Sequence, residues 1–404
     1  MIISISKHRI RKSFEKTYYT FTEIPKPSFN GDFGIYIHVP FCFFKCSFCP
    51  FYKVIYSDKL KDKYLECIRK EIDETSLIGQ AKWVYFGGGT PNTLTVDELY
   101  SILESLENKI NLGSVGIELL PTPLTNEYLQ RLKAVGFTKL SLGVESFSDK
   151  VLHKTGRRKA KNMNLKEIIQ YGRSSLNFWV NVDMMVGLPN QNPDIFREDI
   201  KKTGEINPDQ ITIYPYLILR GLNTIGSLSP TKQFLLIEEA ASILKDIGYD
   251  RKSVWTFALG DDLYDSSRDE LIEDYAGFGP AAFSTYSKWK VVNPEILAYF
   301  KNFTNGTKMG FVAPKSKISD EWRKFAHMLY DLKCHDSKDL PFYIKAYILL
   351  LKLTGYTKNG KLTEKGKMLA HEITKTVVES LPFPIQNPNC IRNYDEYLSY
   401  INGR

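Results

Sequence analysis

The chain has 404 residues, of which 43% are hydrophobic and 25% are charged, so it is long enough to bury a large core. Its longest apolar runs fall short of the ~20 residues that a membrane span needs. The N-terminus has no sustained apolar segment, so we expect no signal peptide. The net charge of +8 is spread along the chain without a long basic block, so we expect no nucleic-acid binding. We therefore expect a protein of the reduced cytoplasm with no membrane span.

A cysteine-rich loop follows the first predicted strand. Residues 1–32 predict an extended, irregular lead-in, and Gly34–Val39 predicts a strand. The loop after it holds three of the six cysteines, Cys42, Cys46 and Cys49, in the spacing C-x3-C-x2-C. Three thiolates this close together can converge on one soft metal centre, whereas a disulfide would leave one thiol over. We therefore predict a metal or iron–sulfur centre.

Three cysteine ligands leave one position open on a tetrahedral metal ion or on a four-iron cluster. A metal centre that does chemistry needs such an open position. A structural zinc would need a fourth ligand, for which His38 is a candidate. The alternative role for His38 is that of a hydrogen-bonded histidine in the core or at the rim. The other cysteines, Cys67, Cys334 and Cys390, lie in a predicted helix or in the far C-terminal part.

Helices and strands alternate after this loop. Including Gly34–Val39, six strands are predicted; the other five cover Trp83–Phe86, Val115–Leu119, Lys139–Val144, Phe178–Val186 and Gln210–Pro215. The intervening helices are expected over Asp58–Thr75, Val96–Ile110, Asn126–Ala134, Leu165–Ser174 and Pro193–Gly204. This alternation predicts an α/β fold of parallel βα units that close into a full or partial barrel. The loops after the strands would form one rim, where sites are built.

The pattern continues with a helix over Lys232–Ile247 and a strand near Ser253–Ala258. The glycine-rich segment Asp274–Ala282 predicts a tight turn, the alternative being a close approach of the backbone to a ligand. Beyond it, two helices, an Asn-Gly hairpin and a last helix are similar to a winged-helix domain. We predict a barrel over residues 33–290 and a smaller, mostly α domain over residues 291–404.

The cysteine loop resembles the cluster loop of the radical SAM enzymes, and YIHVPFC resembles their oxygen-independent coproporphyrinogen III oxidase-like family. Further motifs follow in family order, namely YFGGGTP, IELLPT, LSLGVESFSDKVLHKTGR, VDMMVGLP and GFGPAAFS. The resemblance implies a partial (β/α)6 barrel with a [4Fe-4S] cluster on Cys42, Cys46 and Cys49. S-adenosylmethionine (SAM) would bind the fourth iron, and reduction by a flavodoxin-type or ferredoxin-type donor would release a 5′-deoxyadenosyl radical.

The resemblance also implies the residues that contact SAM. Tyr36 would lie beside the cluster and SAM, and the backbone around Phe48 would lie near the adenine. Arg157 would pair with a carboxylate, a bidentate role that suits guanidinium. Glu118 would bind the SAM ribose or amino group, and Asp183 would be another polar contact of SAM. The alternative for both residues is a solvated position at the rim. The remaining implied contacts are Gly87, Gly88, Gly89 and Thr90, which would bind the SAM amino group, and Glu145, which we expect to take part in catalysis together with Tyr36.

Two further expectations concern the surroundings of the cluster. Some relatives bind a second SAM, but Glu145 stands where many of them carry glutamine, which weakens that inference for this chain. We therefore expect one or two SAM molecules. Phenylalanines around the thiolates are expected to shield the cluster from water, namely Phe41, Phe43, Phe44, Phe48 and Phe51.

Two differences, one from the family's oxidases and one from its heme chaperones, indicate the branch to which this chain is most similar. Coproporphyrinogen III oxidases carry an extra cysteine where this chain has Phe51, and the family's heme chaperones carry a histidine signature that is missing from residues 255–280. The CPFY ending more closely resembles the class C methyltransferases and the anaerobilin synthases. We therefore predict methylation of an sp2 carbon in a flat aromatic or tetrapyrrole-like substrate, using two SAM molecules. The alternatives are oxidative decarboxylation of a porphyrinogen and a non-catalytic heme-binding chaperone.

Such a substrate would need a roomy apolar pocket. Candidate lining residues are Tyr214, Tyr216, Trp255, Phe257, Tyr264 and Phe283, for all of which core packing is the alternative. We expect the protein to act as a monomer.

Overall fold

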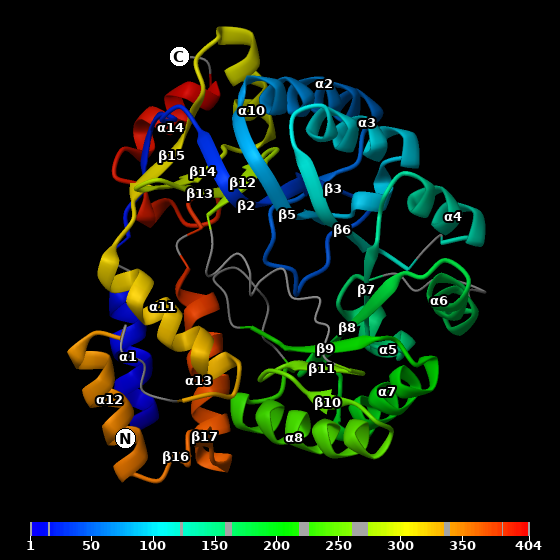
Figure 1. Ribbon diagram of the computed structural model, residues 1–404, viewed down its shortest axis with the longest axis vertical. Helices are drawn as coiled ribbons and strands as arrows, with labels where there is room; N and C mark the ends of the chain where they lie inside the picture. The colour runs from blue at the N-terminus through cyan, green and yellow to red at the C-terminus, as the bar shows by residue number, and fades with distance from the viewer. Residues whose placement is uncertain are drawn as a thin grey trace.

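The structure is a computed structural model that describes residues 2–14, 17–121, 124–157, 164–217, 226–260, 274–334, 340–381 and 383–402. Its centre is a 13-stranded sheet in the order β1-β15-β14-β13-β12-β2-β5-β6-β7-β8-β9-β11-β10 (Figure 1). The barrel strands are β2 (Ser28–Val39), β5 (Ser76–Gly88), β6 (Asn111–Leu119), β7 (Lys139–Glu145), β8 (Trp179–Val186) and β9 (Gln210–Pro215). Neighbours within this group are all parallel, which confirms the six predicted strands and the α/β partial barrel.

The predicted helices cover this sheet (Figure 1). They are α2 (Asp58–Glu74), α3 (Val96–Glu107), α4 (Asn126–Ala134), α6 (Leu165–Ser174), α7 (Pro193–Ile206) and α8 (Pro230–Asp246), with the shorter α5 (Asp149–Lys154) and the 3-10 turn η1 (Pro91–Thr93) between them. The start of α3 is fixed by a capping box, in which Thr95 and Glu98 satisfy each other's backbone N–H groups. Apolar side chains at helical spacing bury one face of α2, so the periodicity predicted this helix correctly.

The irregular lead-in is a wrong prediction. Residues Ile2–Phe14 form α1, and Thr20–Glu23 form β1, which pairs antiparallel with β15 (Met309–Pro314). Helix α1 buries Ser6 and Ile10 and contacts α11 (Lys317–Tyr330) and α13 (Glu364–Ser380). The partners of both elements lie some 300 residues later, so the local sequence pattern contains no sign of them.

The two edges of the sheet also differ from prediction. Strand β11 (Thr256–Ala258) pairs antiparallel with β9, and β10 (Asp250–Arg251) pairs antiparallel with β11, so the parallel pattern ends at β9. At the other edge, the segment predicted as a turn begins with a strand, β12 (Tyr275–Phe278), parallel to β2. Its turn follows at Gly279, where φ is +97°. Antiparallel strands β13 (Phe283–Tyr286), β14 (Trp289–Val292) and β15 then extend the sheet.

The C-terminal part is mostly helical, as predicted. It contains α11, α12 (Phe342–Leu353), the hairpin β16 (Thr357–Lys358) and β17 (Lys361–Leu362) and α13, which correspond to the predicted elements. Helices α10 (Ile296–Asn305) and α14 (Tyr394–Asn402) and the 3-10 turn η2 (Pro388–Cys390) were not predicted. The hairpin turns at Asn359 and Gly360, both with positive φ, as an Asn-Gly turn requires. In the part of the chain that the structure describes, no helix is long and apolar enough to span a bilayer. The predicted domain boundaries at residues 33 and 291 stay predictions.

Candidate active site

Contacts at both ends and in the middle hold the cysteine loop in place. It begins with β3 (Phe41–Cys42), which pairs parallel with β4 (Val54–Ile55). The amide of Ser47 donates to the carbonyl oxygen of Thr155 at 2.9 Å, which ties the middle of the loop to the end of α5. Lys53 Nζ donates to the Cys49 carbonyl oxygen at 2.9 Å. The three thiols therefore stand on a loop that is held in place at several points.

Each of the three thiols has its own neighbours in the fold. Cys46 and Cys49 pack with Phe48 against buried apolar side chains on α5 and at or just after the ends of β8 and β9. Cys42 is buried, and its Sγ lies 3.4 Å from Thr90 Oγ1. Arg157 Nη1 donates to Cys46 Sγ at 3.9 Å. All three are free thiols.

The donor set suits an iron–sulfur cluster better than a single ion. Among the described residues, no three His, Cys, Asp or Glu side chains are grouped closely enough to hold one metal ion. Zinc would draw its sulfur ligands to about 2.3 Å from a common centre, whereas a cubane binds each thiolate through a different iron and accepts a wider triangle. Burial raises the pKa of Cys46 to about 11, and that of Cys42 also rises, so cluster binding would displace protons.

His38 is a hydrogen-bonded core residue and not a fourth ligand. Its Nδ1 lies 3.1 Å from Tyr36 Oη, and its Nε2 lies 3.0 Å from the carbonyl oxygen of Tyr52. Burial lowers the pKa of the imidazole to about 4, so the ring is neutral. Both ring nitrogens already have partners, which confirms the alternative to the zinc hypothesis.

The predicted apolar shield is only partly correct. Phe41 and Phe48 are buried and Phe44 is half-buried. Phe43 and Phe51 are exposed, so the prediction is wrong for these two. Burial of Phe48 comes from side chains on other strand ends, which the loop sequence alone does not contain.

The glycine strip Gly87–Gly89 lies against the cysteine loop because β5 is parallel to β2, with His38 opposite Gly87. A Cβ atom on Gly88, where φ is +107°, would lie 2.7 Å from the His38 ring. On Gly89 it would lie 2.6 Å from the Phe41 carbonyl oxygen. Glycine is therefore needed here for the protein's own packing, and Thr90 is brought to Cys42 by the same register.

Three half-buried carboxylates stand near the carboxyl ends of β6, β7 and β8, namely Glu118, Glu145 and Asp183. Glu118 accepts a hydrogen bond from Tyr85 Oη at 2.8 Å, and the Tyr85 ring stacks on that of Tyr36. Burial raises the pKa of Glu118 and of Glu145 to about 7, and the charge of Asp183 adds to both increases. This end of the sheet is thus suited to a cationic ligand.

Glu145 occupies an unusual backbone conformation. Its φ of +67° lies in the left-handed region, and the pairing of β7 with β8 shifts register between Gly143 and Glu145. Such a bulge re-aims a side chain, a feature often found next to active sites. The Glu145 carboxylate lies 3.7 Å from Arg157 Nη2, and Arg157 also donates to the Gly143 carbonyl oxygen.

A polar row inside the barrel holds Asp183 and was not predicted. Ser141 Oγ donates to Asp183 Oδ2 at 2.6 Å, and Asn181 Nδ2 donates to Asp183 Oδ1 at 2.8 Å. Thr212 Oγ1 donates to Asn181 Oδ1 at 3.0 Å. The sequence signal was available, because these polar residues occupy every second position in otherwise apolar strands.

A second unpredicted network supports the loop that carries Glu145. The buried carboxylate of Asp199, on α7, accepts from Ser146 Oγ at 2.7 Å and from the Phe147 amide at 2.8 Å. Gln191 Nε2 donates to the same carboxylate at 3.3 Å, and Gln191 Oε1 accepts from the Gly187 amide at 2.8 Å. Asp199 thereby joins the loops after β7 and β8. A lone acidic residue within a helix gives no sequence signal for this role.

The predicted pocket aromatics do not form one group. Tyr216, Trp255 and Phe257 are buried, as the core-packing alternative expected, and Trp255 Nε1 donates to His371 Nδ1 at 3.1 Å. Phe283 lies on β13 and contacts the Phe383 ring. Tyr214 is partly exposed at the end of β9. Tyr264 lies outside the described residues.

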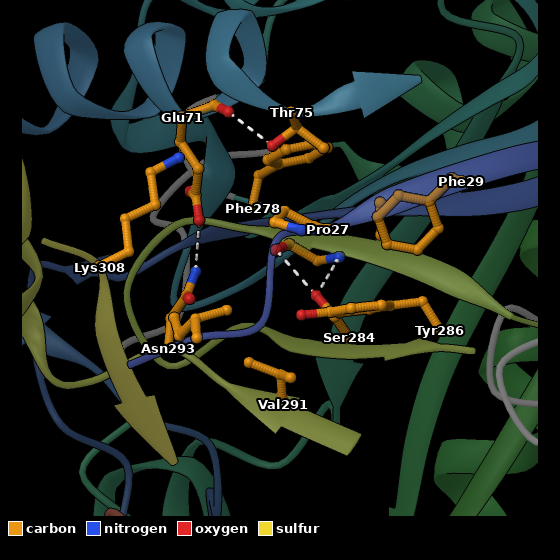
Figure 2. A pocket seen from close by; sticks show the side chains of 13 residues that line it. Pro27, Phe29, Glu71, Thr75, Phe278, Ser284, Tyr286, Val291, Asn293 and Lys308 are labelled. Atoms are coloured by element: carbon orange, nitrogen blue, oxygen red, sulfur yellow. Dashed lines mark hydrogen bonds between the residues drawn. The ribbon is translucent and has the colours of Figure 1, made fainter. Parts of the chain in front are cut away.

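A cavity of about 30 Å³ lies elsewhere, between α2 and strands β12 to β14 (Figure 2). It has room for about two water molecules. Its wall includes Glu71, Asn293, Ser284 and Lys308, and Figure 2 shows Asn293 hydrogen-bonded to Glu71. This cavity is too small to hold SAM or a tetrapyrrole.

Residues 36–203 match the model of the radical SAM superfamily. The chain is 29% identical over 249 residues to the oxygen-independent coproporphyrinogen III oxidase of Synechocystis, covering 59% of this chain and 53% of that protein. It is 25% identical over 377 residues to the heme chaperone HemW of Buchnera aphidicola, covering 86% of this chain and 98% of that protein. The chain thus matches about half the length of that oxidase and nearly the whole of that chaperone.

Among solved structures, the chain is similar to the coproporphyrinogen III oxidase HemN of Escherichia coli. The TM-score is 0.70 at 20% sequence identity, covering 92% of this chain and 93% of that one. This likeness confirms the fold, including the helical C-terminal part.

Proposed function

We propose that this chain, a member of the radical SAM superfamily, binds a [4Fe-4S] cluster on Cys42, Cys46 and Cys49 and cleaves SAM reductively. The observation that carries the proposal is the arrangement at the carboxyl ends of β2 and β5 to β8. There a braced three-thiol loop lies beside the glycine strip, and three carboxylates stand near the ends of the strands that follow. When bound, the cluster supplies the electron that splits the SAM sulfonium and so starts radical chemistry on a substrate.

The chain's own residues would bind and orient SAM. Glu118, Glu145 and Asp183 supply negative charge for a ligand that carries a sulfonium and an ammonium group. Arg157 lies between Cys46 and Glu145 and offers a guanidinium for the SAM carboxylate. Tyr36 and Tyr85 form an aromatic wall that leads to Glu118.

The substrate class is a tetrapyrrole, since the relatives named above act on coproporphyrinogen III or handle heme. Hydrogen abstraction from such a substrate is the reaction that we infer. Phe51 stands where the oxidases carry an additional cysteine, so the substrate of this chain need not be coproporphyrinogen III itself. The electron would come from a low-potential flavodoxin-type or ferredoxin-type donor.

A heme-handling role is the second candidate, favoured by the match along almost the whole length of the chaperone HemW. Methyl transfer with a second SAM was our prediction from the CPFY ending. The relatives named above are an oxidase and a heme chaperone, so neither of them supports that prediction.

The test is an anaerobic reaction of reconstituted protein with SAM and dithionite. We expect four irons per chain, as a [4Fe-4S] cluster requires, and formation of 5′-deoxyadenosine. The variant C42A/C46A/C49A should lose both. A matched control is Cys67→Ala, which removes a buried thiol in α2 and should retain both.

The other products separate the candidates. S-adenosylhomocysteine formed together with 5′-deoxyadenosine would indicate methyl transfer. Tight heme binding without 5′-deoxyadenosine would indicate the chaperone role and contradict the proposed reaction. A folded protein that retains zinc and no iron would contradict the cluster itself.

A further inference from the structure

Helix α12 carries a stripe of exposed apolar side chains that the active site does not explain. Phe342 is 85% exposed, Leu349 55%, Leu350 43% and Leu353 76%. With the exposed Ala346 they occupy positions i, i+4, i+7, i+8 and i+11, which fall on one face of a helix. We call these five residues the α12 stripe. The opposite face packs into the protein through buried residues, namely Ile344, Tyr347, Ile348 and Leu351.

The stripe is longer than scattered surface hydrophobics would be. From Phe342 to Leu353 the helix rises about 16 Å, and each turn contributes at least one exposed apolar side chain. Contiguous exposed apolar surface of this kind marks sites of interaction. Helix α12 lies at the outer edge of the molecule, away from the cysteine loop (Figure 1), so a partner there would not block the active site.

The charged side chains of α12 and of the β16–β17 hairpin are all lysines. Residues 340–363 contain four lysines, at positions 345, 352, 358 and 361, and no aspartate or glutamate. Lys352 is exposed on α12, and Lys358 and Lys361 are exposed on the hairpin β16–β17, which contacts α12. In the part of the chain that the structure describes, none of these three exposed lysines pairs with a carboxylate. Their charge is therefore available to a partner.

We propose that α12 and the β16–β17 hairpin form a docking surface for an anionic lipid bilayer. An apolar helix face flanked by lysines binds at a membrane surface, with its side chains among the acyl chains and its ammonium groups at the lipid phosphates. The exposed stripe is a convex ridge along a single helix, a shape that enters a bilayer interface. Since no described helix can span a bilayer, the association would be peripheral.

A second copy of the chain fits this surface less well. A symmetric contact between two α12 stripes would bring the lysines of both copies together without carboxylates to neutralise them. An acidic protein partner would satisfy the charge but would need an apolar groove of its own to receive Phe342 and Leu353, whereas a bilayer takes up exposed apolar side chains without a shaped site. An anionic bilayer satisfies both the apolar and the charged features.

The test is flotation of the full chain with vesicles of phosphatidylcholine, with or without phosphatidylserine. We expect binding to the vesicles that contain phosphatidylserine, and weaker binding as salt is raised. The variant L349S/L353S should lower the vesicle-bound fraction about tenfold, and K352E/K358E/K361E should do so by a similar factor. A matched control is L235S/L297S, which changes two exposed leucines on other helices and should bind as the wild type does.

Several outcomes would overturn the proposal. These are absence of vesicle binding, equal binding to both kinds of vesicle, or equal loss in the control variant. A dimer that L349S/L353S converts to a monomer without lipid would identify a self-association surface instead. Circular dichroism must show that each variant is folded. Formation of 5′-deoxyadenosine in solution should be unchanged in all of them, so failure of this proposal is distinguishable from failure of the proposed reaction.

Discussion

Glu71 and Glu145 are both carboxylates whose pKa is raised by burial, but they have different partners. One Glu71 oxygen accepts from the Gly279 amide at 2.9 Å and from Tyr299 Oη at 2.7 Å. The other oxygen accepts from Asn293 Nδ2 at 2.8 Å, a contact that Figure 2 shows. Within the described part of the chain, no donor hydrogen-bonds the Glu145 carboxylate, which has an ion pair with Arg157 at 3.7 Å.

The difference separates a structural carboxylate from a binding one. Glu71 joins α2 to the turn after β12, to the residue after β14 and to α10, so its oxygens are used within the fold. Glu145 stands at a bulge beside Glu118 and Asp183, where like charges disfavour one another until a cation arrives. A buried acid with satisfied oxygens stabilises the fold, whereas Glu145, whose carboxylate accepts no hydrogen bond from the described residues, is suited to a ligand.

The largest expected effect is that of Glu71→Ala on stability. This change leaves the Gly279 amide, Asn293 and Tyr299 without their acceptor in the core. The free energy of unfolding should fall by about 3–5 kcal/mol, measured by denaturant titration. Glu66→Ala on the exposed face of the same helix is the control and should change it little. Equal costs for the two variants would contradict the structural role of Glu71.

Asp199→Asn tests the support beneath Glu145. The amide would place an N–H group against the Ser146 or Phe147 donor, so the free energy of unfolding should fall by about 2 kcal/mol. SAM affinity should fall as well, because the Glu145 loop loses its anchor. Isothermal titration calorimetry on the folded variant measures this loss. Unchanged SAM affinity in a destabilised variant would restrict Asp199 to a structural role.

Glu145→Gln should lower SAM affinity and not stability, whereas Glu71→Ala should lower stability. We expect SAM affinity to fall about tenfold, because one anion facing the cation is lost. The free energy of unfolding should not fall, because the neutral amide avoids the cost of ionising a carboxylate whose pKa burial has raised. Equilibrium binding of SAM to reconstituted protein and denaturant titration give the two values. A large loss of stability with intact SAM binding would reverse the assignment of the two carboxylates.

Stability and SAM affinity should change in opposite directions with pH. Because the pKa of Glu118 and Glu145 rises from 4.5 to about 7 on folding, the folded state holds more protons than the unfolded state between these values. The stability of the SAM-free protein should therefore fall as pH rises through this range. SAM affinity should increase as pH rises through about 7, because both carboxylates then ionise. In the variant E118Q/E145Q, stability and SAM affinity should both depend less on pH. A wild-type protein in which stability and SAM affinity change in the same direction with pH would contradict these roles of Glu118 and Glu145.

Local sequence was sufficient to predict the barrel and to propose three cysteines as ligands of one centre. Strand and helix periodicity predicted β2 and β5 to β9 with their helices, because each βα unit buries its own apolar face. The spacing of Cys42, Cys46 and Cys49 predicted a shared centre, because ligands within one loop need no distant partner. The Asn-Gly turn at Asn359 was equally local.

The tertiary structure alone decided the features that depend on distant partners. Helix α1 and strand β1 form against elements near the other end of the chain, and the partners of Glu71 lie 208 to 228 residues after it. The left-handed backbone of Glu145 depends on pairing with β8 and is supported by Asp199. Sequence thus determined which residues could bind a cluster and SAM, because motif spacing is local. Which carboxylates remain available to a ligand was decided by long-range contacts, since only these show which oxygens the fold already uses.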